Sequence, residues 1–336
     1  MLGVAFDGMQ QLVERGQSRI GKALMLGWFG EIQQIERQNE VVNSVLRELV
    51  ELYRGAGVSF VVMKGQTAGA MYPNPLRRQS GDIDVFVWNP PCSQTGHDSY
   101  REACRLIEAN GATLIDLSPE KHAEYTWHNV VVEVHHTLLD MFCPSALHYL
   151  EQLDYSQMVE EREVAGIQVA CFKPAFNCAY MLGHMVHHLL TEGLGLRQVC
   201  DWMLLMKEIE GQVSGNGSQD HCIESIQEHL SGMKLFEAFS VFVAMGTKHF
   251  CLDGSLWQWA ILPKSPQEAE RLMTYIMECG NFGRKANNKH DCKSLTGNLF
   301  NAWTYFGHLL RLRHIAPSEV LYFFPVRISR WWKKKL

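Results

Sequence analysis

Two aspartates interrupt an apolar segment, GDIDVFVW, at residues 81–88. On a β-strand, residues two positions apart share a face, so Asp82 and Asp84 would project together while Ile83 and Val85 face the other way. Two carboxylates held side by side repel each other unless a cation lies between them. Magnesium suits this role, because it prefers oxygen ligands and is commonly completed by substrate phosphates. The pair predicts a divalent-metal site, and a solvated strand end is the alternative.

A third acidic residue lies in a later apolar segment, VVVEVHH, at residues 130–136. Glu133 would lie on the face opposite Val132 and Val134, together with His135. A third carboxylate on a neighbouring strand lets a site hold two cations, which clamp the attacking and leaving oxygens of an in-line displacement. The other interpretation is an outward-facing strand glutamate without a catalytic role.

Periodicity and turn residues predict the elements that would position these acids. Helical spacing predicts helices over 31–56 and 98–112. Alternation and turn residues predict strands over 58–63, 82–88, 112–117, 123–128 and 130–136, and a strand pair over 161–172. The pair 123–128 and 130–136 would form a hairpin around His128–Asn129, and the last pair would turn near Gly166.

From Pro174 onward the pattern is helical. Helices are expected over 173–193, 196–211, 222–246, 265–280 and about 299–313, with polar, glycine-rich loops at 211–220 and 283–294. The fold class is therefore α+β, with a small mixed sheet that has helices packed on it, followed by a mainly helical region. The expected domains are an N-terminal helical segment over 1–57, an α/β domain over 58–172 and a helical C-terminal domain over 173–336.

The segment FVVMKGQTAGAMYPNPLRRQSGDIDVFV, followed by VVVEVHH, resembles the uncharacterised nucleotidyltransferase family of the DNA-polymerase-β-like superfamily. That superfamily carries a glycine-led helix start, then G-x-D-x-D at a strand end, then a third acid on a later strand. Here the pattern falls on Gly65, Asp82, Asp84 and Glu133. In the helical half, LGHMVHHLL and LRQVCDWMLLM look like the family's histidine-bearing helix and its R-x-x-x-D helix, so the resemblance covers roughly residues 33–210.

The resemblance implies a nucleotidyltransferase that uses Mg²⁺ or Mn²⁺ and moves a nucleoside monophosphate from an NTP, such as ATP, to an acceptor hydroxyl with release of pyrophosphate. The acceptor is open among a small molecule, a protein and an RNA. Three acids, Asp82, Asp84 and Glu133, are the expected catalytic and metal-binding residues. The expected nucleotide-binding residues are Lys64, Gly65, Gln66, Arg78 and Gly81.

One residue departs from the superfamily pattern. Its glycine is usually followed by a serine that helps to hold phosphates, whereas Gln66 follows Gly65 here. Phosphate binding would then rely on backbone N–H groups at a helix start and on the charge of Lys64. The departure supports an alternative function, a catalytically degenerate fold that acts as a nucleotide-binding or protein-interaction module, while retention of all three acids opposes it.

Two arginines, Arg77 and Arg78, precede the aspartates. A guanidinium group in this loop would bind triphosphate oxygens bidentately, or form an ion pair that ties the loop to an acidic side chain. We assign the phosphate role to Arg78, which is nearer to the aspartates in sequence.

Histidines gather in HMVHH, at residues 184–188. The i, i+4 spacing of His184 and His188 suits zinc, which makes a metallohydrolase a third hypothesis, but neither an H-E-x-x-H motif nor a third ligand is evident. The family resemblance instead suggests substrate contacts from His184, His188, Arg197 and Asp201. The last two are also spaced for an ordinary helix ion pair.

Composition narrows the class of protein. The 336 residues carry a formal net charge of −5, which argues against a general polyanion binder, although the basic end RISRWWKKKL keeps nucleic acid open. That end is expected to be a solvated terminus whose rings pack on the body. No apolar run approaches the length of a transmembrane helix and no secretory signal is evident. Ten scattered cysteines without a C-x-x-C pair suit reduced thiols, so we expect a cytoplasmic protein.

Overall fold

The computed structural model describes residues 2–333 except 91–97, 119, 216–218 and 280–294. The chain divides into two compact units, residues 1–138 with 154–173, and residues 139–153 with 174–336. The first unit contains a mixed β-sheet with helices and the second is helical, so the predicted α+β class is confirmed. The predicted division into three domains stays a prediction.

The sheet of the first unit has five strands in the order β1-β2-β5-β4-β3. β2 and β5 are parallel, and every other neighbouring pair is antiparallel. The strands are β1 (Phe60–Met63), β2 (Asp82–Val87), β3 (Thr113–Ser118), β4 (His122–Trp127) and β5 (Val130–His135). A second sheet pairs β6 (Val159–Val164) with β7 (Ile167–Phe172), after the 3₁₀ turn η2 (Tyr155–Met158).

Both predicted hairpins are present. The β4–β5 turn has φ values of 49° at His128 and 62° at Asn129, and the β6–β7 turn has 53° at Ala165 and 79° at Gly166. Two consecutive residues with positive φ are typical of the type I′ turn, whose twist matches that of the strands. The turn position fixes the β4–β5 register, from Trp127 opposite Val130 to His122 opposite His135.

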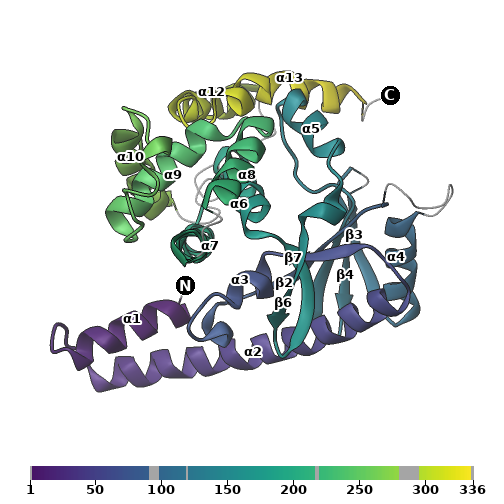
Figure 1. The fold of residues 1–336 in the computed structure, drawn as a ribbon, viewed down its shortest axis with the longest axis horizontal. Helices are drawn as coiled ribbons and strands as arrows, with labels where there is room; N and C mark the ends of the chain where they lie inside the picture. The colour runs from purple at the N-terminus through teal and green to yellow at the C-terminus, as the bar shows by residue number, and fades with distance from the viewer. Residues whose placement is uncertain (1, 91–97, 119, 216–218, 280–294, 334–336) are drawn as a thin grey trace. The chain divides into compact units, whose positions relative to one another are not determined.

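One face of the five-stranded sheet is apolar and packs on two helices, α2 (Lys22–Gly55) and α4 (Ser99–Ala109). Figure 1 shows α2 running along the sheet. The buried residues of this face include Val62, Ile83, Val85, Tyr125, Val132 and Val134. α2 begins nine residues earlier than the predicted start at residue 31, and α1 (Leu2–Glu14) precedes it. Alternating residues of the same strands face the other side, where the acidic side chains lie.

A short connection leads from β1 to β2 through α3 (Gly65–Gly69) and the 3₁₀ turn η1 (Pro75–Arg77). It thus contains a single helical turn after β1 and a loop with two prolines, Pro73 and Pro75. This connection carries all the predicted nucleotide-binding residues.

The second unit consists of helices. They are α5 (Pro144–Glu151), α6 (Pro174–Thr191), α7 (Leu196–Gly215), α8 (Gln219–Gly232), α9 (Phe236–His249), η3 (Gln258–Ala260), α10 (Ser265–Cys279), α12 (Leu295–Leu312) and α13 (Pro317–Lys333). Among the described helices, none has the length and hydropathy needed to cross a bilayer. The described cysteines of both units carry free thiols.

Three sequence interpretations of the second unit change. The helix predicted over 222–246 is two helices, because Lys234 between them has φ 57°, which a right-handed helix does not allow. The loop predicted over 211–220 begins later, since α7 continues to Gly215, and the loop over 283–294 lies outside the described residues. The described part of the basic end, through Lys333, belongs to α13, and Trp331 and Trp332 are 52% and 60% exposed instead of packed on the body.

Candidate active site

The parallel pairing of β2 with β5 places the acidic residues on one face of the sheet. Asp84 is the register partner of Glu133, and Asp82 is the partner of Val131. Side chains of paired residues project from the same face, so all three carboxylates do as well. Asp84 is only 4% exposed, whereas Asp82 and Glu133 are half-buried. The carboxylates therefore range from a buried centre to a solvent-accessible edge.

Two nitrogen-bearing side chains, Lys64 and His135, contact the buried carboxylate of Asp84. The Lys64 Nζ atom and the His135 Nε2 atom each lie 3.1 Å from Asp84 Oδ1. The same His135 nitrogen is 3.0 Å from Glu133 Oε2. Burial lowers the pKa of His135, but its hydrogen bonds with Asp84 and Glu133 outweigh burial and raise this pKa overall. His135 thus bridges an acid on β2 and an acid on β5.

Lys64 adopts an unusual backbone conformation at the end of β1. Its φ and ψ angles are 48° and −138°, and Gly65 has φ 40°. Residues other than glycine rarely adopt such angles, and functional sites are where such strained conformations concentrate. The turn directs the Lys64 ammonium group to Asp84. Since α3 has only five residues, Lys64 supplies more positive charge here than the start of that helix does.

Gln66 is buried and holds the connection in place. Its Nε2 donates to Asn39 Oδ1 on α2 at 3.4 Å, while its Oε1 has no hydrogen-bond partner among the described residues. Asn39 in turn donates to the backbone carbonyls of Leu76 and Arg78, at 2.7 and 2.8 Å. Sequence reasoning missed Asn39, although a polar residue on the apolar face of α2, four positions after Ile35, was a usable signal.

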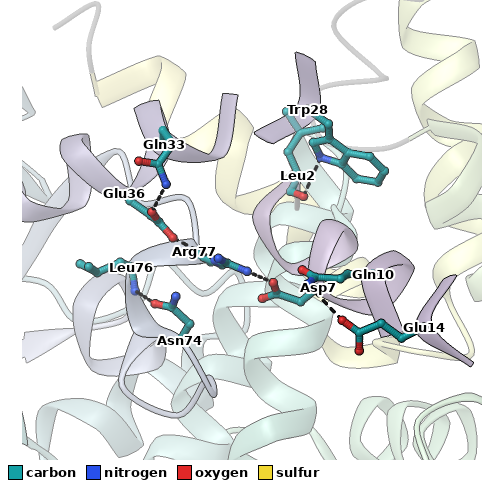
Figure 2. A network of polar contacts seen from close by, with 10 residues as sticks. All are labelled: Leu2, Asp7, Gln10, Glu14, Trp28, Gln33, Glu36, Asn74, Leu76 and Arg77. Atoms are coloured by element: carbon teal, nitrogen blue, oxygen red, sulfur yellow. Dashed lines mark hydrogen bonds and ion pairs between the residues drawn. The ribbon is translucent and has the colours of Figure 1, made fainter. Parts of the chain in front are cut away.

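Arg77 ties α1 and α2 to the loop, as Figure 2 shows. Its Nε donates to Glu36 Oε1 at 2.9 Å, and its Nη1 forms an ion pair with Asp7. The hydrogen bond with Glu36 is the main cause that raises the pKa of Arg77. Of the two roles considered for a loop arginine, Arg77 has the structural one.

Arg78 is 6% exposed and donates from Nη1 to Ser80 Oγ at 2.8 Å. Its side chain lies within the connection and not on the outer surface. Gly81 is exposed, and a side chain at its position would meet no atom within 4 Å. The structure thus places a buried guanidinium group and an open backbone position directly before Asp82.

A second cluster adjoins the acids. The β4–β5 register pairs His122 with His135, and their ring centroids are 4.8 Å apart. In the described part of the chain, His122, Glu133 and His135 are the one group of three metal-capable residues whose ligand atoms all lie within 4.8 Å of one another. Burial, followed by proximity to His135, lowers the pKa of His122. Sequence reasoning missed His122 and gave His135 no role, although the hairpin turn already fixed their pairing.

The residues that the resemblance assigns to magnesium fit that ion by donor chemistry. Asp82 and Asp84 offer carboxylate oxygens from one face of one strand, and Glu133 does so from the neighbouring strand. Lys64 Nζ and His135 Nε2 both lie 3.1 Å from Asp84 Oδ1, and His135 Nε2 is 3.0 Å from Glu133 Oε2, on the face where a divalent ion would bring positive charge. The three carboxylates do not themselves form a group as tight as the histidine cluster.

The remaining predicted residues lie in the second unit. On α6, His184 and His188 share a hydrogen bond between their Nε2 atoms at 3.0 Å, and His188 Nδ1 is 3.5 Å from Glu192. On α7, Arg197 is half-buried and Asp201 is 3% exposed. The one tight metal-capable group of the described residues does not include the α6 histidines, which weakens the zinc-hydrolase hypothesis.

Residues 9–224 match the sequence profile of a family described as uncharacterised nucleotidyltransferase. The chain belongs to this family. The match spans the sheet, its acids, and helices α6 and α7, in agreement with the resemblance seen in the sequence. Membership establishes a nucleotidyltransferase-like protein at the level of family and fold.

Comparison with curated proteins and with solved structures adds no evidence about function. No curated protein matches this nucleotidyltransferase-family chain. The crystal structure of an antigenic nucleotidyltransferase-like protein from Paracoccidioides brasiliensis is similar over 67% of this chain and 96% of its own, with 12% identity and a TM-score of 0.35. A likeness at this level carries no argument about function.

Proposed function

We propose that this member of the nucleotidyltransferase family transfers a nucleoside monophosphate from an NTP to an acceptor hydroxyl. The observation that supports the proposal is the shared face of β2 and β5, where Asp84 and Glu133 are register partners and Asp82 is two residues away. Paired acids with compensating cations in a partly accessible site are strong candidates for chemistry. A purely structural role would not need three carboxylates on one face.

The reaction forms a bond between the acceptor oxygen and the α-phosphorus. The bond from that phosphorus to the bridging oxygen breaks, and pyrophosphate leaves with the electron pair. Magnesium or manganese, held by Asp82 and Asp84, would neutralise phosphate charge and lower the pKa of the acceptor hydroxyl. Glu133 would accept the hydroxyl proton, and His135, 3.0 Å from Glu133 Oε2, would orient that carboxylate.

The triphosphate would be held by positive charge next to the acids. Lys64 lies 3.1 Å from Asp84, so its ammonium group would be near the same phosphates. Arg78, with Gly65, Gln66 and Gly81, lines the rest of the connection, and a guanidinium group binds phosphate oxygens bidentately. We assign acceptor contacts to His184, His188, Arg197 and Asp201. Catalysis would then consist of positioning and charge neutralisation.

The test is incubation of the full-length protein with each of the four α-labelled NTPs, Mg²⁺ and a cell extract, followed by identification of the labelled acceptor. We expect label in one acceptor class, and we expect Asp82→Asn to abolish it. Asp116→Asn, which changes an exposed acid on β3 of the same sheet, is the matched control and should keep full transfer.

A second candidate function is a nucleotide-binding module without turnover. The observation that favours it is Gln66, which is buried and bonded to Asn39 where the superfamily places a phosphate-binding serine. If the protein binds NTP, labels nothing in any extract, and binds equally well as Asp82→Asn, this function replaces the transferase.

A further inference from the structure

The cluster of His122, Glu133 and His135 includes an imidazole that the proposed transfer does not use. His122 on β4 lies opposite His135 on β5, and Glu133 precedes His135 by two residues on the same face. One ligand atom from each residue lies within 4.8 Å of the other two. Three residues of two adjacent strands thus present nitrogen and oxygen donors to one point, on a regular sheet that holds them in register.

An unpartnered atom lies in this cluster. The Nδ1 atom of His122 is buried and has no hydrogen-bond partner among the described residues. Buried polar atoms in folded proteins are nearly always paired, and the exceptions commonly adjoin a bound ion or water. The orphaned nitrogen belongs to the His122 ring, whose centroid is 4.8 Å from that of His135.

The donor set indicates which ligand fits. Two imidazoles and one carboxylate suit first-row transition-metal ions, whereas Mg²⁺ and Ca²⁺ prefer oxygen donors throughout. Ligand atoms bonded to such an ion at about 2.0–2.2 Å lie about 2.8–3.1 Å from their neighbours in octahedral geometry and about 3.3–3.6 Å in tetrahedral geometry. The distance of 3.0 Å between His135 Nε2 and Glu133 Oε2 falls in the octahedral range.

We propose that His122, Glu133 and His135 bind one divalent transition-metal ion, such as Zn²⁺ or Mn²⁺. The site differs from the Asp82–Asp84 pair in its donors and shares Glu133 and His135, but not His122, with the proposed transfer machinery. Its existence does not depend on transfer activity. An ion there would replace the hydrogen bonds of His135 with Glu133 and with Asp84, and would bring a fixed positive charge beside the buried carboxylate of Asp84.

Cobalt serves as the probe, because Co²⁺ occupies such sites and absorbs visible light. Metal-free full-length protein is titrated with Co²⁺ in a buffer that contains millimolar Mg²⁺. We expect one equivalent to bind with a visible absorption band, and Zn²⁺ to displace it while Mg²⁺ does not. His122→Asn should weaken this binding at least about 10-fold, because loss of a direct ligand costs no less than loss of an outer-shell partner.

Two variants keep the test independent of folding. His122→Cys retains a metal ligand, so it should bind Co²⁺ with a new near-ultraviolet thiolate-to-cobalt absorption. Glu124→Gln, next to the site on β4 and opposite Glu133, is the matched control and should bind Co²⁺ like the wild type. The proposal is overturned if the wild type binds no Co²⁺ in the presence of Mg²⁺, or if His122→Asn and the wild type bind it equally.

The outcome is separable from the proposed transfer. Asp82→Asn should lose NMP transfer and keep the cobalt spectrum, since Asp82 is not part of the cluster. If the protein binds Co²⁺ at this site but transfers no NMP, the proposed transfer is wrong and the proposed metal site is supported. If it transfers NMP but binds no Co²⁺, the proposed metal site is wrong and the proposed transfer is supported.

Discussion

Two nearly buried carboxylates, one in each unit, are compensated in different ways. Asp84 on β2 is 4% exposed and lies against the side chains of Lys64 and His135. Glu319 in the first turn of α13 is 1% exposed and accepts hydrogen bonds from the backbone N–H groups of Phe142 and Cys143, at 2.7 and 2.9 Å. Side-chain cations can exchange partners when a ligand arrives, whereas backbone amides cannot move away without unfolding.

These different partners indicate that Asp84 is placed for chemistry and that Glu319 is placed for structure. Glu319 satisfies donors just before α5, at Cys143, the residue that caps that helix. Its removal would leave buried N–H groups unpaired. The contacts of Asp84 include the side chains of Lys64 and His135, which are groups that a phosphate or a metal ion can replace. The predictions below test this distinction.

The largest effect is expected from Asp84→Asn. Asparagine has the same shape and keeps an oxygen that accepts from Lys64, so the free energy of unfolding should fall only by about 1.5–3 kcal/mol, the value of a hydrogen bond to a charged group. Loss of the charge should lower NMP transfer by about 100- to 1,000-fold or more, in the range seen when one electrostatic contact of a transition state is removed. Steady-state kinetics and urea unfolding measure the two effects; a fully active variant would refute the role of Asp84.

Glu319→Ala should have the opposite profile. Two buried N–H groups lose their acceptor, so the free energy of unfolding should fall by about 3 kcal/mol. Transfer per folded molecule should stay unchanged. Glu319→Gln, which keeps one acceptor oxygen, is the control and should cost less in the same urea titration. A drop in transfer that exceeds the loss of folded protein would contradict the structural role.

Lys64→Met removes one of the two cations beside Asp84. We expect NTP affinity to fall about 10-fold, the value of one charge-assisted hydrogen bond at the lower end of its range. Arg77→Met is the matched control, because Arg77 is engaged with Asp7 and Glu36 and should affect stability but not NTP affinity. Calorimetric titration of both variants with NTP decides the point, and equal affinities in the two would remove Lys64 from the site.

The smallest effect is the pH dependence that Glu319 contributes. Burial raises the pKa of Glu319 above its usual 4.5, although its backbone hydrogen bonds oppose the rise. Between 4.5 and the raised pKa, the folded state holds more protons than the unfolded state, so this contribution to stability is full below the window and is lost as pH rises through it. Glu319→Gln should remove this decline, and unfolding curves between pH 4 and pH 8 would show it; an identical pH profile in the variant would count against the assignment.

Local pattern was sufficient to predict the acidic face. The alternation in GDIDVFVW and VVVEVHH assigns each residue to a face, and strand periodicity is preserved in the folded sheet. The turn at His128–Asn129 was also predicted, and it fixes His122 opposite His135. The pairing of His122 with His135 could therefore have been predicted by counting the strand register back from the turn to the other end of the hairpin.

Hydrogen-bond and ion-pair partners that are far apart in the sequence could not be predicted. Arg77 bonds to Asp7, 70 positions earlier, and only the packing of α1 makes that contact. Gln66 bonds to Asn39 across 27 positions. α13, which contains the buried Glu319, was not predicted from the sequence, because Pro325 and the basic residues of this segment are typical of a solvated tail. Periodicity assigns a face to each side chain, but it does not identify the partner on another element.

Nucleotidyl transfer is distinguished from other phosphoryl transfers by which phosphorus atom of the NTP reaches the acceptor. The full-length protein is incubated with ATP, or with whichever NTP is used, labelled in parallel at the α- or the γ-phosphate, together with Mg²⁺ and the acceptor fraction. Nucleotidyl transfer predicts that the acceptor carries the α-label and that the γ-label leaves in pyrophosphate, with neither event in Asp84→Asn. Appearance of the γ-label on the acceptor, or release of pyrophosphate by Asp84→Asn at the wild-type rate, would contradict it.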